Sequence, residues 1–219
     1  MLWHKAIGAG GGGPISPVLT YVSSNSRDGS GISSYTFSSQ SIGSDADGEF
    51  LVIVTCAFNG GSAVNDLTDL TVGGTSADLE VATSSSPTDM RIFTIAAPAG
   101  STADIVLTAG GTNTTYGIGV YRLNAESKTP NDTDTVAGGS AVDMVLSVSE
   151  NGAALAGRFQ INGAVTTWTG LTEDFDFDTR SNEWFSGAHA NGLGEDATYD
   201  ISVNETNPDG GSMVAASWA

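Results

Sequence analysis

The chain is poor in cysteine, in basic residues and in long apolar runs, and each shortage excludes a class of protein. Among its 219 residues Cys56 is the single cysteine, so the sequence holds no disulfide framework and no cysteine-based metal cluster. Seven Lys and Arg stand against 25 Asp and Glu, a formal net charge of −18, and such a surface repels nucleic-acid phosphates. No stretch approaches the roughly 18 to 20 apolar residues that cross a bilayer as a helix, so membrane insertion is not expected.

Motifs of catalysis and cofactor binding are equally scarce. The histidines are His4 and His189, too few for a zinc site, and neither G-x-S-x-G nor G-x-x-x-x-G-K occurs. Gly8, Gly10 and Gly13 formally match G-x-G-x-x-G, but prolines follow them in place of a helix. We therefore expect no cofactor and no enzymatic activity, and we interpret His189 as a hydrogen-bonded histidine within a strand.

Residues 1–17, MLWHKAIGAGGGGPISP, are the most informative segment that is present. An apolar and basic head is followed by the glycine-rich run 8–13 and by two prolines that favour an extended path. At about 3.5 Å per residue the segment could span roughly 60 Å. We interpret it as an attachment arm whose head binds another molecule through Leu2, Trp3, His4, Lys5 and Ile7. A terminal tail without a partner is the alternative, and a secretory signal is disfavoured because glycines replace its apolar core.

The remainder of the chain shows the pattern of short strands separated by Gly-, Ser-, Thr- and Asn-rich turns, with no amphipathic helical pattern and no repeat of 20 to 50 residues. This pattern predicts an all-β fold, an antiparallel β-sandwich of jelly-roll-like type, with residues 18–219 forming one domain behind the arm 1–17. A division near residues 128–140 is the alternative. The segments expected as strands are 18–23, 34–42, 49–58, 66–72, 75–81, 90–96, 103–108, 116–123, 142–148, 153–160, 165–168, 173–179, 184–190, 197–203 and 212–218.

Two turn signals predict which of these strands pair. Gly73-Gly74 suits a two-residue turn with positive φ between the strands 66–72 and 75–81. Asn151-Gly152 is the strongest hairpin signal and predicts that 142–148 pairs with 153–160. The polar segment 128–139 is interpreted as a long connection, and Asp132 and Asp134 within it as ordinary turn residues.

Two strands carry predictions about packing. Cys56 lies in the apolar run 50–58, which indicates a buried strand with a small hydrophobic thiol. Gly117 and Gly119 alternate with Tyr116, Ile118 and Val120, so one face of that strand lacks side chains. We expect an aromatic ring from a facing sheet to lie against this bare face.

The densest acidic site is the run from Glu173 to Asp178. On a strand, Phe175 and Phe177 would point inward, while Asp174, Asp176 and Asp178 would share the outer face about 7 Å apart. Three such carboxylates are weak candidates for a Ca²⁺ site. The favoured interpretation is a solvated edge strand that discourages unwanted pairing. A glycosidase would need a second, separately placed acid, and nothing in the sequence locates one.

The aromatic residues admit two interpretations. A sugar-stacking platform could be formed from Trp168, Trp184, Trp218, Tyr116, Tyr121 and Tyr199. Aromatic side chains in a sandwich of this size are more often core anchors, and we favour that interpretation.

Several segments taken in order resemble a known group of proteins. They are 48–54 (GEFLVIV), 70–77 (LTVGGTSA), 97–100 (APAG), 117–123 (GIGVYRL) and 168–174 (WTGLTED), together with the glycine-linked arm. The chain resembles β-sandwich proteins of tailed-bacteriophage virions, which use N-terminal attachment peptides. The resemblance implies no catalytic residues. It implies a multi-copy or homo-oligomeric structural protein at the virion surface, bound to capsid or tail subunits.

Within that resemblance two roles remain, a capsid decoration (cement) protein or a tail or head fibre component that contributes to host adsorption. The stalk of a fibre would show sequence repeats or heptads before its head domain. This sequence shows none, which favours the role of a capsid decoration protein. The contrasting hypothesis is a carbohydrate-binding module or lectin-like adhesin, with Ca²⁺ held at the aspartates of the acidic run and a host-surface glycan as ligand.

Overall fold

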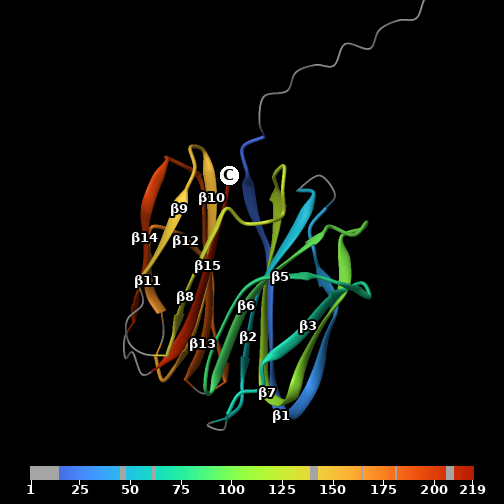
Figure 1. The fold of residues 1–219 in the computed structure, drawn as a ribbon. Coiled ribbons are helices and arrows are strands. Elements are labelled where there is room, and N and C mark those ends of the chain that lie inside the picture. Colours follow the sequence, from blue (N-terminus) through green and yellow to red (C-terminus); the bar gives the residue numbers. More distant parts are fainter. Residues whose placement is uncertain are drawn as a thin grey trace, which may run out of the picture.

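The computed structural model describes residues 15–44, 48–60, 63–138, 143–163, 165–180, 182–205 and 210–219, and every regular element in them is a β-strand (Figure 1). The strands are β1 (Val18–Ser41), β2 (Phe50–Phe58), β3 (Leu67–Val72), β4 (Thr75–Ser76), β5 (Asp78–Ser85), β6 (Thr88–Ala96), β7 (Thr102–Asn124), β8 (Asp132–Ala137), β9 (Asp143–Val148), β10 (Gly152–Ile161), β11 (Val165–Thr169), β12 (Thr172–Arg180), β13 (Glu183–Leu193), β14 (Asp196–Glu205) and β15 (Gly211–Trp218). They form antiparallel sheets, so the expected all-β sandwich class is confirmed.

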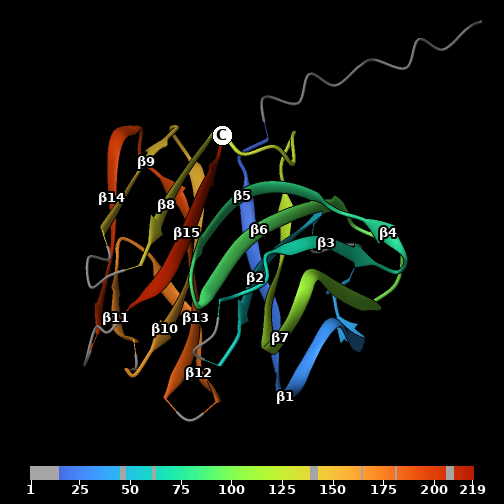
Figure 2. The same ribbon diagram turned by 60° about the horizontal axis from the view of Figure 1, so that its bottom comes forward.

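The first sheet, sheet A, is built around two long strands. β1 and β7 run antiparallel from the pair Val18–Asn124 to the pair Ser41–Thr102, with register shifts on both sides of Ile32. The sequence predicts each of them as two separate strands. The structure keeps each continuous, and the shifts in the middle let the pair bend (Figure 2).

The bend curls sheet A until it is nearly closed. One half of β7 pairs with β2 and the other with β3, and the order along the sheet is β4-β3-β7-β2-β6-β5. Polar side chains bridge the two halves of β1: Gln40 Nε2 donates to Ser23 Oγ at 2.7 Å, and Asn25 Nδ2 donates to Gln40 Oε1 at 3.0 Å. The enclosed core contains Ile53, Leu70 and other apolar side chains of the same strands.

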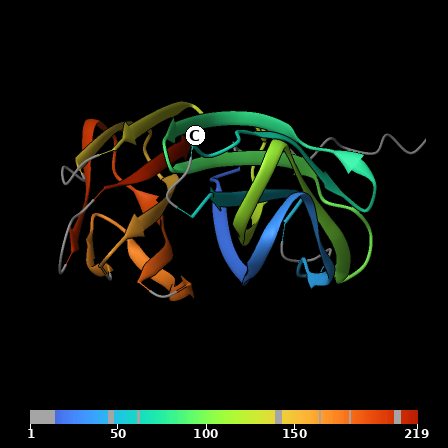
Figure 3. The same cartoon turned by 90° about the horizontal axis from the view of Figure 1, so that it is seen from below.

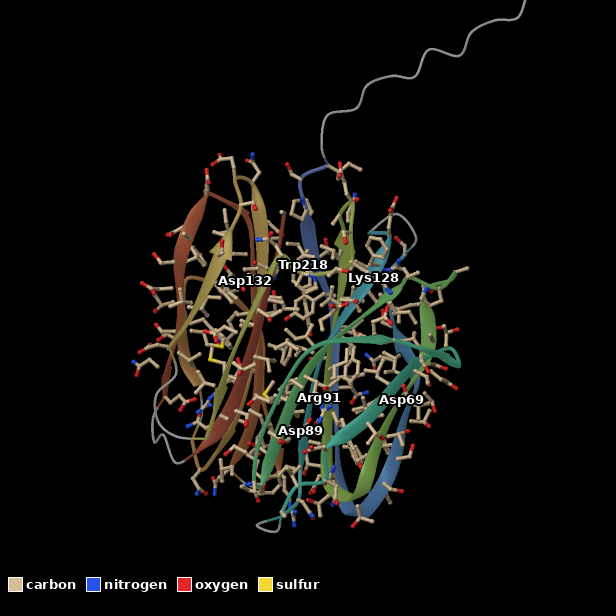
Figure 4. The ribbon with its side chains drawn as sticks, in the orientation of Figure 1. Asp69, Asp89, Arg91, Lys128, Asp132 and Trp218 are labelled. Carbon is tan, nitrogen blue, oxygen red and sulfur yellow. The ribbon has the colours of Figure 1, made fainter. Side chains whose placement is uncertain are left out.

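Asp89 and Arg91, both on β6, form an ion pair inside sheet A. The pair lies near Asp66, which immediately precedes β3. The carboxylate of Asp89 is fully buried and accepts from Arg91 Nε at 2.9 Å and Nη2 at 2.8 Å (Figure 4). Arg91 also lies 3.9 Å from Asp66 Oδ2, beside β3. Burial raises the pKa of Asp89, and the bonds from Arg91 oppose that rise.

The second half of the chain adds two layers. Sheet B has the order β12-β13-β10-β15-β8 and sheet C the order β11-β14-β9. Sheet B lies in the middle, because one core cluster joins it to sheet A and another joins it to sheet C (Figure 3). β10 and β15 are therefore covered on both faces, which matches their uniform burial. That residues 18–219 form a single domain remains a prediction.

The bare glycine face of β7 receives aromatic rings from sheet B, as expected. A Cβ placed on Gly117 would lie 2.8 Å from Phe185 Cδ1, and one placed on Gly119 would lie 2.5 Å from Phe175 Cε1. Gly187 of β13 faces the same Phe175 ring at 2.5 Å. Glycines on both sheets therefore let the layers approach closely around these rings.

Local turn signals were correct at one site and wrong at another. Gly73 and Gly74 turn with φ of 57° and 84° between β3 and β4, as predicted. The returning strand is shorter than the predicted 75–81, because residues from Asp78 onward form β5, which pairs with β6. Asn151 has φ of 59° in a turn, but β9 pairs with β14 while β10 pairs with β13 and β15, so the hairpin prediction is wrong. The buried β10 needs a strand on either side and a layer on either face, whereas β9 keeps one exposed face and belongs to the outer sheet.

The polar segment 128–139, predicted only as a connection, contains a strand. This strand is β8, which pairs with β15 from Ser217–Asp132 to Ser212–Ala137. Its residues alternate between partly buried and exposed, as in an edge strand with one face toward the protein. Because nearly all of these residues are polar, the sequence pattern did not indicate a strand.

Candidate functional site

The predicted arm head, Leu2, Trp3, His4, Lys5 and Ile7, lies outside the described residues. The described chain begins at Ile15, and residues 15–19 join the arm to β1. We call residues 15–19 the arm root. This segment is the part of the predicted attachment device whose contacts the structure defines.

The side-chain amide of Asn191 clamps the arm root to sheet B. Asn191 Oδ1 accepts from the backbone N–H of Leu19 at 2.7 Å, and Asn191 Nδ2 donates to the Leu19 carbonyl at 2.8 Å. The amide therefore imitates one residue of a neighbouring strand at the open edge of β1. The Leu19 side chain is 1% exposed and packs in the core shared by sheets A and B.

Two further contacts hold the root. Pro17 is buried, and the backbone N–H of Ile15 donates to Glu126 Oε1 at 3.1 Å. A pocket of about 310 Å³ lies beside the root, lined by Ile15, Ser16, Pro17, Glu150, Asn151 and Ala219. The arm root and Ala219 therefore lie at the same end of the molecule, which we call the arm pole (Figure 1).

The arm pole combines exposed apolar and acidic side chains. Among the described residues, the large exposed hydrophobic side chains are Ile15, Val18, Leu79 and Val145, and the first two belong to the arm root. Glu126 and Glu150 each place a carboxylate beside it. Such a surface offers apolar contact and favours a partner with positive charge.

The acidic run lies on β12, which stands at one end of the strand order in sheet B. The acidic run therefore lies on an edge strand, in agreement with the favoured interpretation from the sequence. Phe175 and Phe177 point into the core between sheets A and B, also as expected. The edge is irregular, with register shifts between Glu173 and Phe175 and between Asp178 and Arg180, and such shifts discourage further strand pairing.

The expectation that three aspartates share one outer face is wrong. The shift before Phe175 turns Asp174 toward sheet A, where Asp174 Oδ2 accepts from Tyr121 Oη at 2.9 Å and lies 2.8 Å from His189 Nδ1. Asp176 alternates with the inward phenylalanines and stays on the other face. His189 is the hydrogen-bonded strand histidine that the sequence indicated.

Tyr121 is fully buried in this trio, and burial followed by the charge of Asp174 raises the pKa of Tyr121. The trio ties β7 of sheet A to β12 and β13 of sheet B. Within the described ranges, no group of three or more His, Cys, Asp or Glu side chains is placed to hold a metal ion. The carboxylates of Asp174, Asp176 and Asp178 therefore do not converge on one cation.

The aromatic side chains serve the core. Trp218 is 1% exposed and its Nε1 donates to the Lys128 carbonyl at 2.9 Å (Figure 4). Tyr116 and Tyr121 are fully buried, and the partly buried Trp168 donates to Ser186 Oγ at 2.8 Å. These four rings point inward and do not form an exposed sugar-binding platform, so the structure supports the core-anchor interpretation for them. Tyr199 is partly buried and packs against the core between sheets B and C, and Trp184 is partly buried on β13.

Sequence reasoning missed the residues that close the edge of sheet C. Asp134 Oδ2 accepts from the N–H of Val145 at 2.9 Å, and Asp132 Oδ2 accepts from the N–H of Ser147 at 2.7 Å. Both aspartates lie on β8, at the edge of sheet B beside β9, and Figure 4 labels Asp132. Their interpretation as turn residues is wrong because both lie within a strand. Each also accepts from the N–H of the next residue, Thr133 at 2.9 Å and Thr135 at 2.7 Å, and no local signal reveals the second bond to a distant strand.

The described residues therefore form an all-β, three-layer sandwich whose arm root is clamped to sheet B at the arm pole. No helix among the described residues is long and apolar enough to cross a membrane. Comparison with known proteins finds no matching family model, no matching curated protein and no matching solved structure.

Proposed function

We propose that the chain is a non-enzymatic structural protein at the surface of a tailed-phage virion, held there by its N-terminal arm. It serves as a capsid decoration (cement) protein or as a component of a tail or head fibre. Its partners are other virion proteins, and it is present in several copies on the particle. In the fibre role the sandwich also contacts the host surface.

The observation that carries this proposal is the attachment of the arm root. Two hydrogen bonds of 2.7 and 2.8 Å fix the backbone of Leu19 to Asn191, and the Leu19 side chain is buried in the core shared by two sheets. A force that pulls on the arm would therefore act on the packed core of the sandwich and not on a loose tail. An attachment arm needs such a rigid connection to the folded body, whereas a tail without a partner does not.

The composition supports the same role. The acidic, disulfide-free body stays soluble and separate from its neighbours, and the apolar and basic residues of the predicted head are segregated in residues 2–7. The strand edges at β9 and β12 are blunted, so these two edges are poorly suited to strand pairing between copies. We assign attachment to the arm, whose head carries the apolar and basic residues.

The test is deletion of residues 2–13 followed by co-sedimentation with tailed-phage particles assembled without the protein. We expect the shortened chain to unfold at the same temperature as the full chain but to stay in the supernatant. A second variant, Trp3→Ala with Ile7→Ala, keeps the length of the arm and should lose most of its binding. Ala9→Ser, a small change within the glycine-rich linker, is the matched control that should bind normally.

Normal co-sedimentation of the deletion variant would show that the arm is not the anchor. The number of copies per particle then separates the two roles: hundreds of copies indicate decoration, and three to a few dozen indicate a tail or fibre component.

A further inference from the structure

The tip of the β12–β13 hairpin meets the bend of β1 and β7 through one arginine. Arg180 Nε lies 3.4 Å from Asp28 Oδ1, and Arg180 Nη1 donates to Thr114 Oγ1 at 3.3 Å. Arg27 reaches the same place and donates to the Thr114 carbonyl at 3.0 Å. Arg180 therefore connects the hairpin of sheet B to both long strands of sheet A.

A buried carboxyl group stands opposite this arginine. Glu183 is the cross-strand partner of Arg180 in the hairpin register and is 8% exposed. Glu183 Oε2 is buried and has no hydrogen-bond partner. A carboxylate placed there without a partner costs free energy, so the site favours either a proton on Glu183 or a move of Arg180 toward it.

The charged and titratable groups around Glu183 come from three elements. Arg180 and Asp178 belong to β12, Asp28 belongs to β1, and the thiol of Cys56 belongs to β2. Burial is the main cause that raises the pKa of Glu183 to about 7; Arg180 opposes the rise, and Asp28 and Asp178 add to it. The group thus changes its charge near neutral pH.

We propose that Glu183 is a pH-sensitive switch for the contact between the hairpin tip and sheet A. When Glu183 is protonated, Arg180 binds Asp28 and Thr114 and ties the two sheets. When the proton leaves to solvent, the Glu183 carboxylate draws Arg180 to itself across the hairpin, and the tie to β1 and β7 is released. This inference does not depend on the proposed virion role.

The experiment is hydrogen exchange of the full chain at pH 5.5 and pH 8.5, with each rate divided by the intrinsic rate at the same pH. We expect protection of the amides of residues 182–185 and 27–28 to fall about fivefold at the higher pH, the size typical of one partly exposed charged tie. Glu183→Gln should keep the protection of the low-pH state at both pH values. Glu195→Gln, an exposed carboxyl remote from the hairpin tip, is the matched control and should behave as the wild type.

Arg180→Gln separates the switch from a general effect of burial. It should show the low protection of the released state at both pH values, because the tie is absent whatever the charge of Glu183. Equal protection of the wild-type tip at the two pH values would overturn the proposal. A pH-dependent loss that persists in Glu183→Gln would overturn it as well.

Discussion

Replacement of Gly119 by alanine tests the packing that joins the two halves of the molecule. The new Cβ would lie 2.5 Å from Phe175 Cε1, 2.6 Å from Phe175 Cζ and 3.5 Å from Val54 Cγ1. The first two separations are far below an ordinary carbon contact of about 3.5 to 4.0 Å. The ring therefore has to move by roughly 1 Å to restore such a contact.

The surroundings leave the ring little room to do so. Gly187 approaches the same ring from β13, and the centroids of Phe185, Phe177 and Tyr21 lie 5.0, 5.5 and 5.8 Å from that of Phe175. Overpacking in a core costs about 1 to 3 kcal/mol, and removal of glycine from a strand returns about 0.5 to 1 kcal/mol. Because the neighbouring rings confine Phe175, we take the upper part of the overpacking range and expect a net loss of about 2 kcal/mol, which lowers Tm by roughly 4 to 8 °C in a chain of this size.

The measurement is urea unfolding together with a thermal scan. Gly194→Ala is the matched control, because an added Cβ there meets no heavy atom within 4 Å, and it should stay within about 0.5 kcal/mol of the wild type. In a Phe175→Leu background the smaller side chain leaves space, so Gly119→Ala should cost at least about 1 kcal/mol less than in the wild type. The reasoning fails if Gly119→Ala is no more destabilising than Gly194→Ala.

Three other predictions concern charged side chains. Arg158 and Glu205 form a pair whose side chains are 0% and 1% exposed, with Nε and Oε1 2.6 Å apart, so Glu205→Gln should cost about 3 kcal/mol in urea unfolding, and a cost below about 1 kcal/mol would refute a tightly coupled pair. Double replacement of Asp132 and Asp134 by alanine uncaps two amides of β9 and should produce dimers detectable by light scattering, whereas a strictly monomeric variant would show that this edge needs no protection. Burial, followed by the charge of Glu173, raises the pKa of Asp176 to about 7, so the folded state holds the proton more tightly and stability falls as pH rises from about 4 to 7. Asp176→Asn should remove that slope and be about 1 kcal/mol more stable than the wild type at pH 8, after allowance for the screening of a partly exposed group; an unchanged slope would contradict this assignment.

Strand content could be predicted from the sequence wherever the signal was local. The run 50–58 became the buried strand β2, with Cys56 fully buried, and the glycine pair 73–74 became a turn with positive φ. The bare face at Gly117 and Gly119 received Phe185 and Phe175, because only a ring from another layer can fill a strip without side chains. In each case a few neighbouring residues carried the whole signal.

Prediction failed where the outcome depended on distant residues. The Asn151-Gly152 turn formed, yet β9 and β10 entered different sheets, because pairing follows the burial that each strand requires. Asp174 left the face of Asp176 because a register shift in β12 turned it toward Tyr121 and His189. Asn191, which clamps the arm root, lies 172 positions away from Leu19.

The sequence by itself determined that the chain is built of strands, that Gly73-Gly74 turns through positive φ, and which faces of several strands are apolar. These properties depend on side-chain alternation and backbone sterics within a few residues. Tertiary structure alone decided which strands became neighbours, which aspartates cap a foreign backbone and where the arm is clamped. These outcomes depend on how three sheets pack together and on which distant side chains accept hydrogen bonds from the N–H groups of the edge strands. No short segment of the sequence contains that information.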